Sequence, residues 1–256
     1  MLLILLYSFT EHGNSIISFA VTFDHYIKFF SDPDFLLVLW RSFGIAVKTT
    51  VICLLLGYPL AYYIARSAEK WQNILVLCIT IPTWINMLVR TYAWIGLLSD
   101  GGLFAQILGF FGVEEVEILY TEFAVLLGMV YNFLPFMIYP IYNTMQKMDH
   151  SYIEAAQDLG ASPMKVFTKV MVPLSMPGVM SGVMMVFMPT ISTFAIAELL
   201  TMNNVKLFGT TIQENINNGM WNYGAALSLI MLVLIFATEL FSDNDEDRAS
   251  NEGGII

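Results

Sequence analysis

The sequence predicts an all-α integral membrane protein, on the evidence of its composition and of its long uncharged segments. Hydrophobic residues make up 57% of the 256 residues, charged residues make up only 12%, and the mean hydropathy is +0.68. A soluble domain carries about twice that share of charged residues. Backbone groups in lipid need internal hydrogen-bond partners, and the apolar segments lack the alternation of a barrel strand. Each segment is therefore predicted to be a helix.

The candidate membrane spans are the uncharged segments that approach roughly 20 residues. They are Thr49–Ala65, Trp71–Val89, Phe123–Gln146, Val170–Ala197 and Trp221–Thr238. The first two are short, and we expect them to extend past Lys48 or Arg90, whose side chains can snorkel or face the helix bundle. Met1–Phe9 covers only about half a bilayer and lacks the basic start and cleavage site of a signal peptide. We interpret it as the outer half of a first spanning helix.

Basic residues predict the orientation of these helices. One short loop carries Arg66 and Lys70, and another carries Lys147, Lys165 and Lys169. Both loops lie on the same side of the membrane if five helices follow the first, and the opposite loops hold few basic residues. The positive-inside rule therefore places both loops in the cytosol.

The formal net charge of −10 comes largely from the outer loops and the C-terminal end of the chain. The acidic outer-loop residues are Asp24, Asp32, Asp34, Asp100, Glu114, Glu115 and Glu117. An acidic outer surface attracts cations, although ordinary solvated loops explain these residues equally well. Nucleic-acid binding is not indicated, because it requires a basic patch. After a transmembrane domain at 1–241, the polar and acidic segment 242–256 is predicted to be a disordered cytoplasmic tail.

The chain contains no motif for enzymatic chemistry or for a metal site. The patterns G-x-x-x-x-G-K-[ST], H-E-x-x-H and G-x-S-x-G do not occur in it. It is therefore predicted neither to bind ATP itself nor to catalyse a reaction. His12, His25 and His150 form no ligand cluster, so no metal site is expected. Cys53 and Cys78 lie within predicted helices, and we interpret them as packing residues and not as a disulfide.

The loop 147–173 is predicted to begin with a short helix. Ser151, with Glu154 three residues later, has the pattern of a capping box, and the two alanines that follow favour a helix. Gly160 is placed to end this helix in a left-handed conformation. The loop is thus more than a flexible connection between two membrane helices.

A second helix is expected in the later part of the same loop. Ser162 followed by Pro163 has the pattern of a helix start, because proline is favoured in the first helical turn. We expect this helix to run to Pro173, so that the loop forms a helix, a tight turn and a helix. An ordinary helical hairpin is the alternative interpretation, but it does not require these residue types at these offsets.

The order of residues in this loop resembles the EAA loop of ABC-importer permeases, which has the form E-A-A-x3-G-x9-I-x-L-P. Val170 and Val172 stand where that pattern has isoleucine and leucine. In that family the loop docks on a separate ATPase subunit, and the resemblance implies the same coupling role here. The residues expected to form the coupling element are Ser151, Glu154, Ala155, Ala156, Asp158, Gly160, Pro163 and Pro173.

Three further segments resemble the PotB-type polyamine permeases within that family. They are Ile81–Trp94, Leu134–Tyr142 and Phe187–Leu200, and the resemblance covers most of Thr49–Phe236. It implies spermidine or putrescine as the substrate. Relatives that carry other solutes share parts of these segments, so another small solute is the alternative.

For a polycation, the candidate contacts are aromatic rings and carboxylates near the outer mouth of the membrane domain. Aromatic faces attract ammonium groups, and a charged residue at the end of a span is a functional candidate by default. The candidates are Trp84, Tyr92, Trp94, Asp100, Glu122 and Glu198. Tryptophan and tyrosine also form interfacial belts, and this interpretation remains open for the three aromatic residues.

Taken together, these resemblances imply the type I (MetI-like) fold of ABC-importer membrane domains, with about six helices of which the first is incomplete. They also imply a PotC-like second permease subunit, a dimer of PotA-like ATPase subunits and a PotD-like extracytoplasmic binding protein, assembled in a bacterial cell membrane. The ATPase would use ATP and Mg²⁺, and this chain would bind no cofactor. A membrane-embedded enzyme and a secondary transporter or channel are the alternatives from other classes, and neither explains the docking loop.

Overall fold

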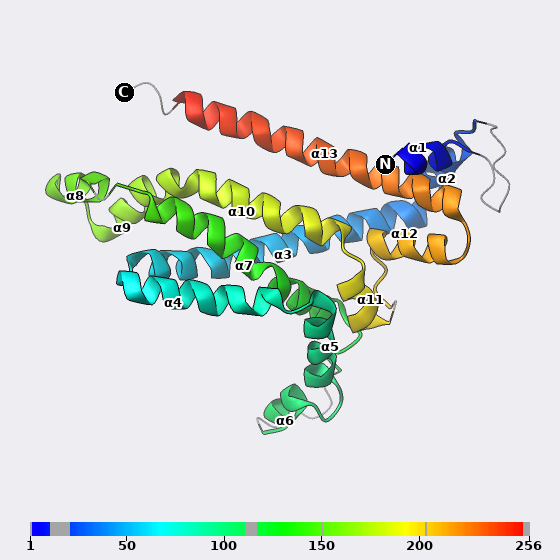
Figure 1. The fold of residues 1–256 in the computed structure, drawn as a ribbon, viewed down its shortest axis with the longest axis horizontal. Coiled ribbons are helices and arrows are strands. Elements are labelled where there is room, and N and C mark those ends of the chain that lie inside the picture. The colour runs from blue at the N-terminus through cyan, green and yellow to red at the C-terminus, as the bar shows by residue number, and fades with distance from the viewer. Residues whose placement is uncertain (1, 11–20, 111–116, 150, 203, 253–256) are drawn as a thin grey trace. The chain divides into compact units, whose positions relative to one another are not determined.

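The computed structural model describes residues 2–10, 21–110, 117–149, 151–202 and 204–252, and most of them are helical (Figure 1). The helices are α1 (Leu2–Ser8), α2 (Asp24–Ser31), α3 (Pro33–Arg66), α4 (Glu69–Thr80), the 3-10 turn η1 (Ile81–Trp84), α5 (Met87–Leu98), α6 (Leu103–Phe110), α7 (Glu122–Gln146), α8 (Ser151–Asp158), α9 (Pro163–Val166), the π-helical turn η2 (Phe167–Met171), α10 (Val172–Ser192), α11 (Ala195–Thr201), α12 (Phe208–Asn217) and α13 (Trp221–Glu252).

The chain folds as two compact units. The first unit combines Met1–Val47, Leu88–Gly128 and Met188–Ile256, and the second combines Lys48–Met87 and Met129–Phe187. The predicted coupling loop lies wholly in the second unit.

Four helical stretches of the described chain are long and apolar enough to cross a membrane. They are Pro33–Arg66, Glu122–Gln146, Pro163–Ser192 and Trp221–Glu239, and a fifth is obtained if the broken pair Glu69–Trp84 and Met87–Ile107 counts as one span. The structure therefore confirms an all-α membrane protein. It also confirms the expected extension of the first long helix past Lys48, since α3 begins at Pro33.

The prediction of one continuous helix over Trp71–Val89 is wrong. Helix α4 passes into η1, and Ile85 then has an extended backbone (φ −77°, ψ 137°) before α5 begins. Pro82 lacks the N–H that would continue the α-helical hydrogen bonds. The Thr80 and Thr83 hydroxyls donate to the carbonyls of Val76 (2.7 Å) and Thr80 (2.6 Å), which gives these carbonyls partners other than backbone N–H groups.

The predicted segment Val170–Ala197 is also not a single helix. Helix α10 ends at Ser192, and Ala197 belongs to the separate helix α11. The break follows Pro189, which removes one backbone donor from the helix. The Ser192 hydroxyl lies within hydrogen-bond distance of the Met188 and Pro189 carbonyls, at 3.1 and 3.2 Å. It competes there with the backbone donors of the last turn.

Both ends of the described chain are helical. Helix α13 includes residues 242–252, for which a disordered tail was predicted, and residues 253–256 lie outside the described part of the chain. At the N-terminal end, α1 has 7 residues. The segment after α1 is fastened to α13, because the Asn222 side-chain amide donates to the Thr10 carbonyl (2.6 Å) and lies 2.7 Å from the Thr10 hydroxyl.

Close packing in the second unit depends on glycines that face a neighbouring helix. A Cβ atom on Gly178 would lie 2.7 Å from the Pro140 carbonyl oxygen, and one on Gly182 would lie 3.1 Å from the Met137 carbonyl oxygen. These glycines of α10 therefore let its backbone approach α7 directly. This is the small-residue packing within one subunit that a Gly-x-x-x-Gly spacing favours.

Packing in the first unit joins the start of α12 to α3. The backbone N–H of Phe208 donates to the buried Ser42 hydroxyl at 2.7 Å. The Phe208 ring packs edge-on to Phe29, which is itself almost fully buried. In the same unit, Gly128 of α7 lies against Leu200 and Ile196 of α11. These contacts hold the short helices α2, α11 and α12 against the long helices of the unit.

Candidate functional site

The predicted coupling loop begins with helix α8, and the side-chain hydrogen bond at its start involves Asp149 and not the Ser151 hydroxyl. The Asp149 carboxylate accepts a hydrogen bond from the backbone N–H of Ser151 at 2.9 Å. Ser151 is already helical, so the predicted capping box with Ser151 as the N-cap is incorrect. This bond satisfies the first backbone donor of α8, and Glu154 lies in the first turn of the helix. A negative charge there is favourable at the positive end of the helix dipole.

Gly160 ends this helix as predicted. Its φ is +76°, in the left-handed region. The N–H of Ala161 donates to the Ala156 carbonyl at 3.0 Å, and the N–H of Gly160 donates to the Gln157 carbonyl at 2.9 Å. This pair of bonds is a Schellman motif, which requires a residue that tolerates positive φ. The prediction for Gly160 is therefore confirmed.

The second part of the loop begins where expected but does not stop at Pro173. Ser162 is the N-cap of α9 and Pro163 its first residue, although the Ser162 side chain makes no capping bond. The chain then continues through η2 and α10 as one long helix. The predicted end at Pro173 is wrong, because the helix passes from η2, which ends at Met171, into α10, which contains this proline. The turn changes the bonding register where the proline lacks an N–H.

The inner side of the loop is an apolar core. Ile153 of α8, Val166 of α9 and Met171 of η2 are each at least 94% buried, with Phe167 and Tyr62 packed against them. The spacing of the hydrophobic residues on α8 and α9 thus fixes which side of each short helix faces the protein. The loop is a packed hairpin and not a loose connection.

The outer side of the loop exposes apolar side chains beside charged ones. Leu159 is 89% exposed, Met164 70% and Tyr152 57%. The predicted coupling residues around them are exposed too, apart from Ala156, which is partly buried: Ser151, Glu154, Ala155, Asp158, Gly160, Pro163 and Pro173. Exposed apolar residues rimmed by charges are typical of a protein–protein docking surface.

The six candidate pathway residues do not fall into one unit. Trp84 belongs to the second unit, where it ends η1 and is 75% exposed. The other five belong to the first unit. Tyr92 and Trp94 lie on α5, Asp100 lies in the turn after it, Glu122 begins α7, and Glu198 lies in the first turn of α11. Tyr92, Asp100 and Glu198 are exposed, whereas Trp94 and Glu122 are half-buried.

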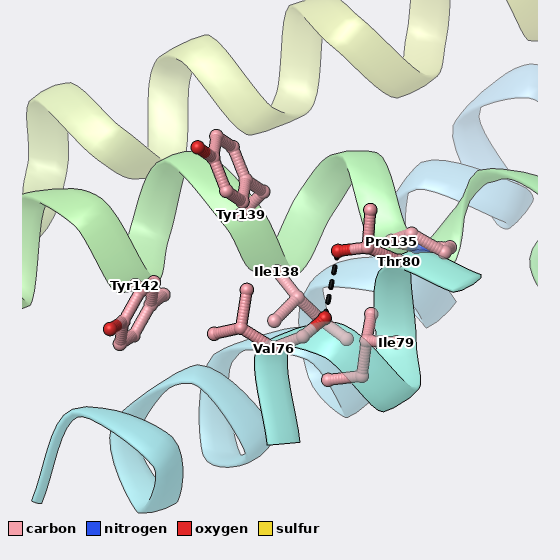
Figure 2. A pocket seen from close by; sticks show the side chains of 7 residues that line it. All are labelled: Val76, Ile79, Thr80, Pro135, Ile138, Tyr139 and Tyr142. Carbon is pink, nitrogen blue, oxygen red and sulfur yellow. Dashed lines mark hydrogen bonds between the residues drawn. The ribbon is translucent and has the colours of Figure 1, made fainter. Parts of the chain in front are cut away.

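A small pocket lies between α4 and α7 in the second unit. Figure 2 shows Val76, Ile79 and Thr80 of α4 near Pro135 and Ile138 of α7. Its volume of about 20 Å³ is enough for roughly one water molecule. In this conformation it cannot hold a solute.

A larger polar cleft of about 560 Å³ lies in the first unit, between α3 and α12. Its charged lining residues are Asp32, Asp34, Arg41, Lys206 and Glu214, with Asn204, Asn215 and Asn218 beside them. The Lys206 ammonium pairs with the Glu214 carboxylate at 3.0 Å. Because its lining combines both signs of charge, the cleft is not a simple cation trap. The part of the chain that the structure describes holds no cluster of three metal-ligating side chains.

Sequence reasoning missed one polar junction near the predicted coupling loop. The Gln72 amide nitrogen donates to the carbonyls of Ala65 (3.0 Å) and Ser67 (2.8 Å), and its oxygen lies 3.4 Å from the Tyr142 hydroxyl and 3.4 Å from Gln146 Nε2. One side chain thereby links the ends of α3 and α7 to α4. The polar pair Gln72 and Asn73 at the start of an apolar segment was the signal for it.

Comparison with known proteins agrees with this architecture. Residues 54–250 match the family model described as "binding-protein-dependent transport system inner membrane component". The chain is 36% identical over 238 residues to the spermidine/putrescine transport system permease protein PotB of Haemophilus influenzae, covering 91% of this chain and 83% of that one. It is 34% identical over 229 residues to PotB of Escherichia coli, covering 88% and 83%.

Solved structures share the fold at low sequence identity. A bacterial alginate ABC transporter, in complex with an alginate pentasaccharide-bound periplasmic protein, matches with a TM-score of 0.72 at 18% identity, covering 89% of this chain and 83% of that one. The MetNI methionine ABC transporter, in inward-facing conformations, matches with a TM-score of 0.63 at 13% identity, covering 84% and 95%. These matches confirm the predicted MetI-like fold.

Proposed function

The chain belongs to the family of binding-protein-dependent transport system inner membrane components, and we propose that it is the polyamine-translocating permease subunit of an ATP-driven importer. It is a multi-pass membrane protein and a permease subunit of the ABC-importer type.

The observation that best supports the coupling role is the form of the loop 147–173. Its two short helices are held together by a buried core on one side and expose Leu159, Met164 and Tyr152 on the other. The chain has no nucleotide-binding motif of its own. A partner that hydrolyses ATP must therefore contact the chain, and this exposed hairpin is a suitable surface for it.

The proposed assembly contains a second, PotC-like permease subunit, two PotA-like ATPase subunits and a PotD-like extracytoplasmic binding protein. ATP and Mg²⁺ are bound and used by the ATPase subunits, and this chain binds neither. Closure of the ATPase dimer moves the docked loops and switches the membrane helices between inward-facing and outward-facing states. Such a switch requires that ATP and the loaded binding protein each bind more tightly to one of the two states than to the other.

Spermidine or putrescine is the proposed substrate. Support comes from the names of the relatives that share 34–36% identity over most of their length. It also comes from the exposed carboxylates Asp100 and Glu198 and the aromatic residues Tyr92 and Trp94 in the first unit. Carboxylates and aromatic faces both attract ammonium groups. Another small solute on the same fold is the alternative.

The orientation can be tested by cysteine labelling, because the docking role requires the loop to face the cytosol. A single cysteine at the exposed Ser162 should react with an impermeant maleimide only from the cytosolic side, and one at the exposed Asn217 only from outside. Cys78 is exposed and Cys53 is buried, so both are first replaced by alanine. The reverse labelling pattern would overturn the orientation and the docking role with it.

The proposed function is tested by transport in reconstituted vesicles. The permease pair, the ATPase and the binding protein are assembled, and uptake of labelled spermidine, putrescine, a sugar and an anion is followed with and without ATP. We expect ATP-dependent uptake of a polyamine only. Robust uptake of the sugar or the anion instead would refute the substrate, whereas uptake that does not need ATP would refute the importer mechanism.

A further inference from the structure

Phe167, in the π-helical turn η2, occupies a position between two tyrosines of α3. Its ring lies 5.8 Å from the Tyr58 ring at an interplanar angle of 88°, and 5.7 Å from the Tyr62 ring at 89°. Tyr58 and Tyr62 are four residues apart, so they stand on the same face of α3. Edge-to-face contacts between aromatic rings are favourable. Because Phe167 makes one such contact with each of two successive turns of α3, a shift of Phe167 along α3 in either direction would break one of them.

Phe167 is also joined firmly to the coupling hairpin. It packs against the buried core of Ile153, Val166 and Met171, and Tyr62 packs against the same core. A displacement of α8 must therefore act on Phe167 through close-packed side chains, since cores of this kind do not compress. Phe167 and Tyr62 thus both lie between the hairpin core and the long membrane helix α3.

The backbone at Phe167 differs from that of an ordinary helix. The N–H of Val172 donates to the Phe167 carbonyl, five residues earlier, which is the bond of a π-turn. The turn holds one residue more than an α-helical turn, and that residue corresponds to roughly 100° of rotation about the helix axis. The orientation of Phe167 toward α3 therefore depends on the turn that precedes Pro173.

Two neighbouring contacts continue the link along α3. Beyond the turn, the Tyr58 hydroxyl lies 2.9 Å from the Ser175 hydroxyl of α10. Toward the end of α3, the Arg66 guanidinium lies 5.3 Å from the centre of the Tyr62 ring. The same two tyrosines that hold Phe167 thus also contact α10 and the cytosol-facing end of α3.

We propose that Phe167, clamped between Tyr58 and Tyr62, is the positioning residue that transmits movement of the coupling hairpin to helix α3. This role rests on the proposed function, because it assumes that an ATPase moves the hairpin. Phe167 itself takes no part in holding the ATPase, which contacts the outer side of the loop. Loss of the ring therefore separates ATP hydrolysis from transport and leaves the complex assembled.

The test compares ring-removing and ring-retaining variants in the complete reconstituted complex. Phe167→Leu and Tyr62→Leu remove one partner of the edge-to-face contacts, whereas Tyr62→Phe keeps the ring and serves as the matched control. The measurements are copurification of the ATPase, ATP hydrolysed and labelled spermidine imported. In both leucine variants we expect uptake to fall by about tenfold, which is within the usual range of coupling between linked sites. Hydrolysis and copurification should stay near wild type, and Tyr62→Phe should match wild type throughout.

Three other results would contradict the proposed role of Phe167 or the proposed function. An unchanged ratio of ATP hydrolysed to spermidine imported in both leucine variants overturns the role of Phe167 and leaves the importer function standing. Loss of ATPase copurification in both leucine variants also overturns it, because the contact would then be part of the assembly. Absence of ATP-dependent uptake by the wild-type complex refutes the proposed function itself, and this transmitting role with it.

Discussion

Replacing Gly160 with valine is expected to leave the protein in the membrane and to lower ATP-driven uptake strongly. Gly160 has φ +76°, and a Cβ atom there would meet no other atom within 4 Å. The cost of the substitution is therefore conformational and not steric. A non-glycine residue held in this region costs about 1–3 kcal/mol, and a β-branched residue resists it most. The Schellman motif should open, and α8 should lose its fixed position on the hairpin.

The matched control is Gly160→Asn, because asparagine is the residue after glycine that best tolerates the left-handed region. Uptake, ATP hydrolysis and copurification of the ATPase are measured for both variants. We expect Gly160→Val to lose at least about tenfold in uptake, the effect of roughly 1.4 kcal/mol, and Gly160→Asn to retain most of it. Equal uptake by the two variants would show that the left-handed turn does not matter for coupling.

Glu154 provides an independent test of the same docking surface. It is exposed in the first turn of α8, so Glu154→Lys changes the charge presented to a partner without disturbing the buried core. Glu154→Gln keeps the size of the side chain and removes only its charge. We expect the lysine variant to copurify poorly with the ATPase and the glutamine variant to be intermediate. Normal uptake by both Glu154→Lys and Gly160→Val would remove this loop as the docking element.

The features that could be predicted from the sequence are those that depend on a single residue type in a local position. The prediction for Gly160 needs no knowledge of tertiary contacts, because the left-handed residue that ends a helix is usually glycine and sometimes asparagine. Pro163 at the start of α9 follows from its fixed φ and its missing N–H. The Gly-x-x-x-Gly spacing of residues 178 and 182 favours close helix packing, and the structure places both glycines against α7.

The wrong predictions concern places where two local preferences compete. The side chains of Ser151 and Asp149 can each accept a hydrogen bond from a backbone N–H at the start of α8, and the sequence alone does not decide between them. Pro82, Pro173 and Pro189 all lie in apolar segments, yet the chain bends or breaks after Pro82 and Pro189 and continues after Pro173. At Pro173 the helix continues, after the π-helical turn η2. Hydropathy does not distinguish these outcomes, because it records polarity and not the hydrogen-bonding register.

The contacts that sequence analysis missed join residues far apart in the chain. Phe167 meets Tyr58 and Tyr62, and Gln72 meets Tyr142. In an apolar helix, aromatic residues are equally compatible with packing, lipid contact and an interfacial belt. Only the three-dimensional arrangement shows that Phe167 lies between two tyrosines. The backbone conformation of the coupling loop can therefore be predicted from the sequence to a large extent. The side-chain contacts that link the loop to the membrane helices cannot.

The carboxylates of the first unit are expected to contribute to polyamine uptake. Glu198 lies in the first turn of the short helix α11, and Asp100 lies in the turn after α5. Both side chains are exposed, and the described residues provide neither of them with an ion pair. A polycation that approaches the protein from outside meets charges that the protein itself does not neutralise.

The variants Glu198→Gln and Asp100→Asn remove these charges and keep the shape of the side chains. We expect the double variant to lower the uptake of labelled spermidine by about fivefold, with assembly and ATP hydrolysis unchanged. Raising the salt concentration should narrow the difference in uptake between wild type and the double variant, because exposed charges are screened.

Trp94→Leu should have a smaller effect on uptake. Trp94 is half-buried, with its ring 6.1 Å from that of Phe104, and a cation–π contact is weaker than a charge pair. Unchanged uptake in the double variant would exclude both carboxylates from the polyamine pathway and leave the aromatic residues as interfacial anchors.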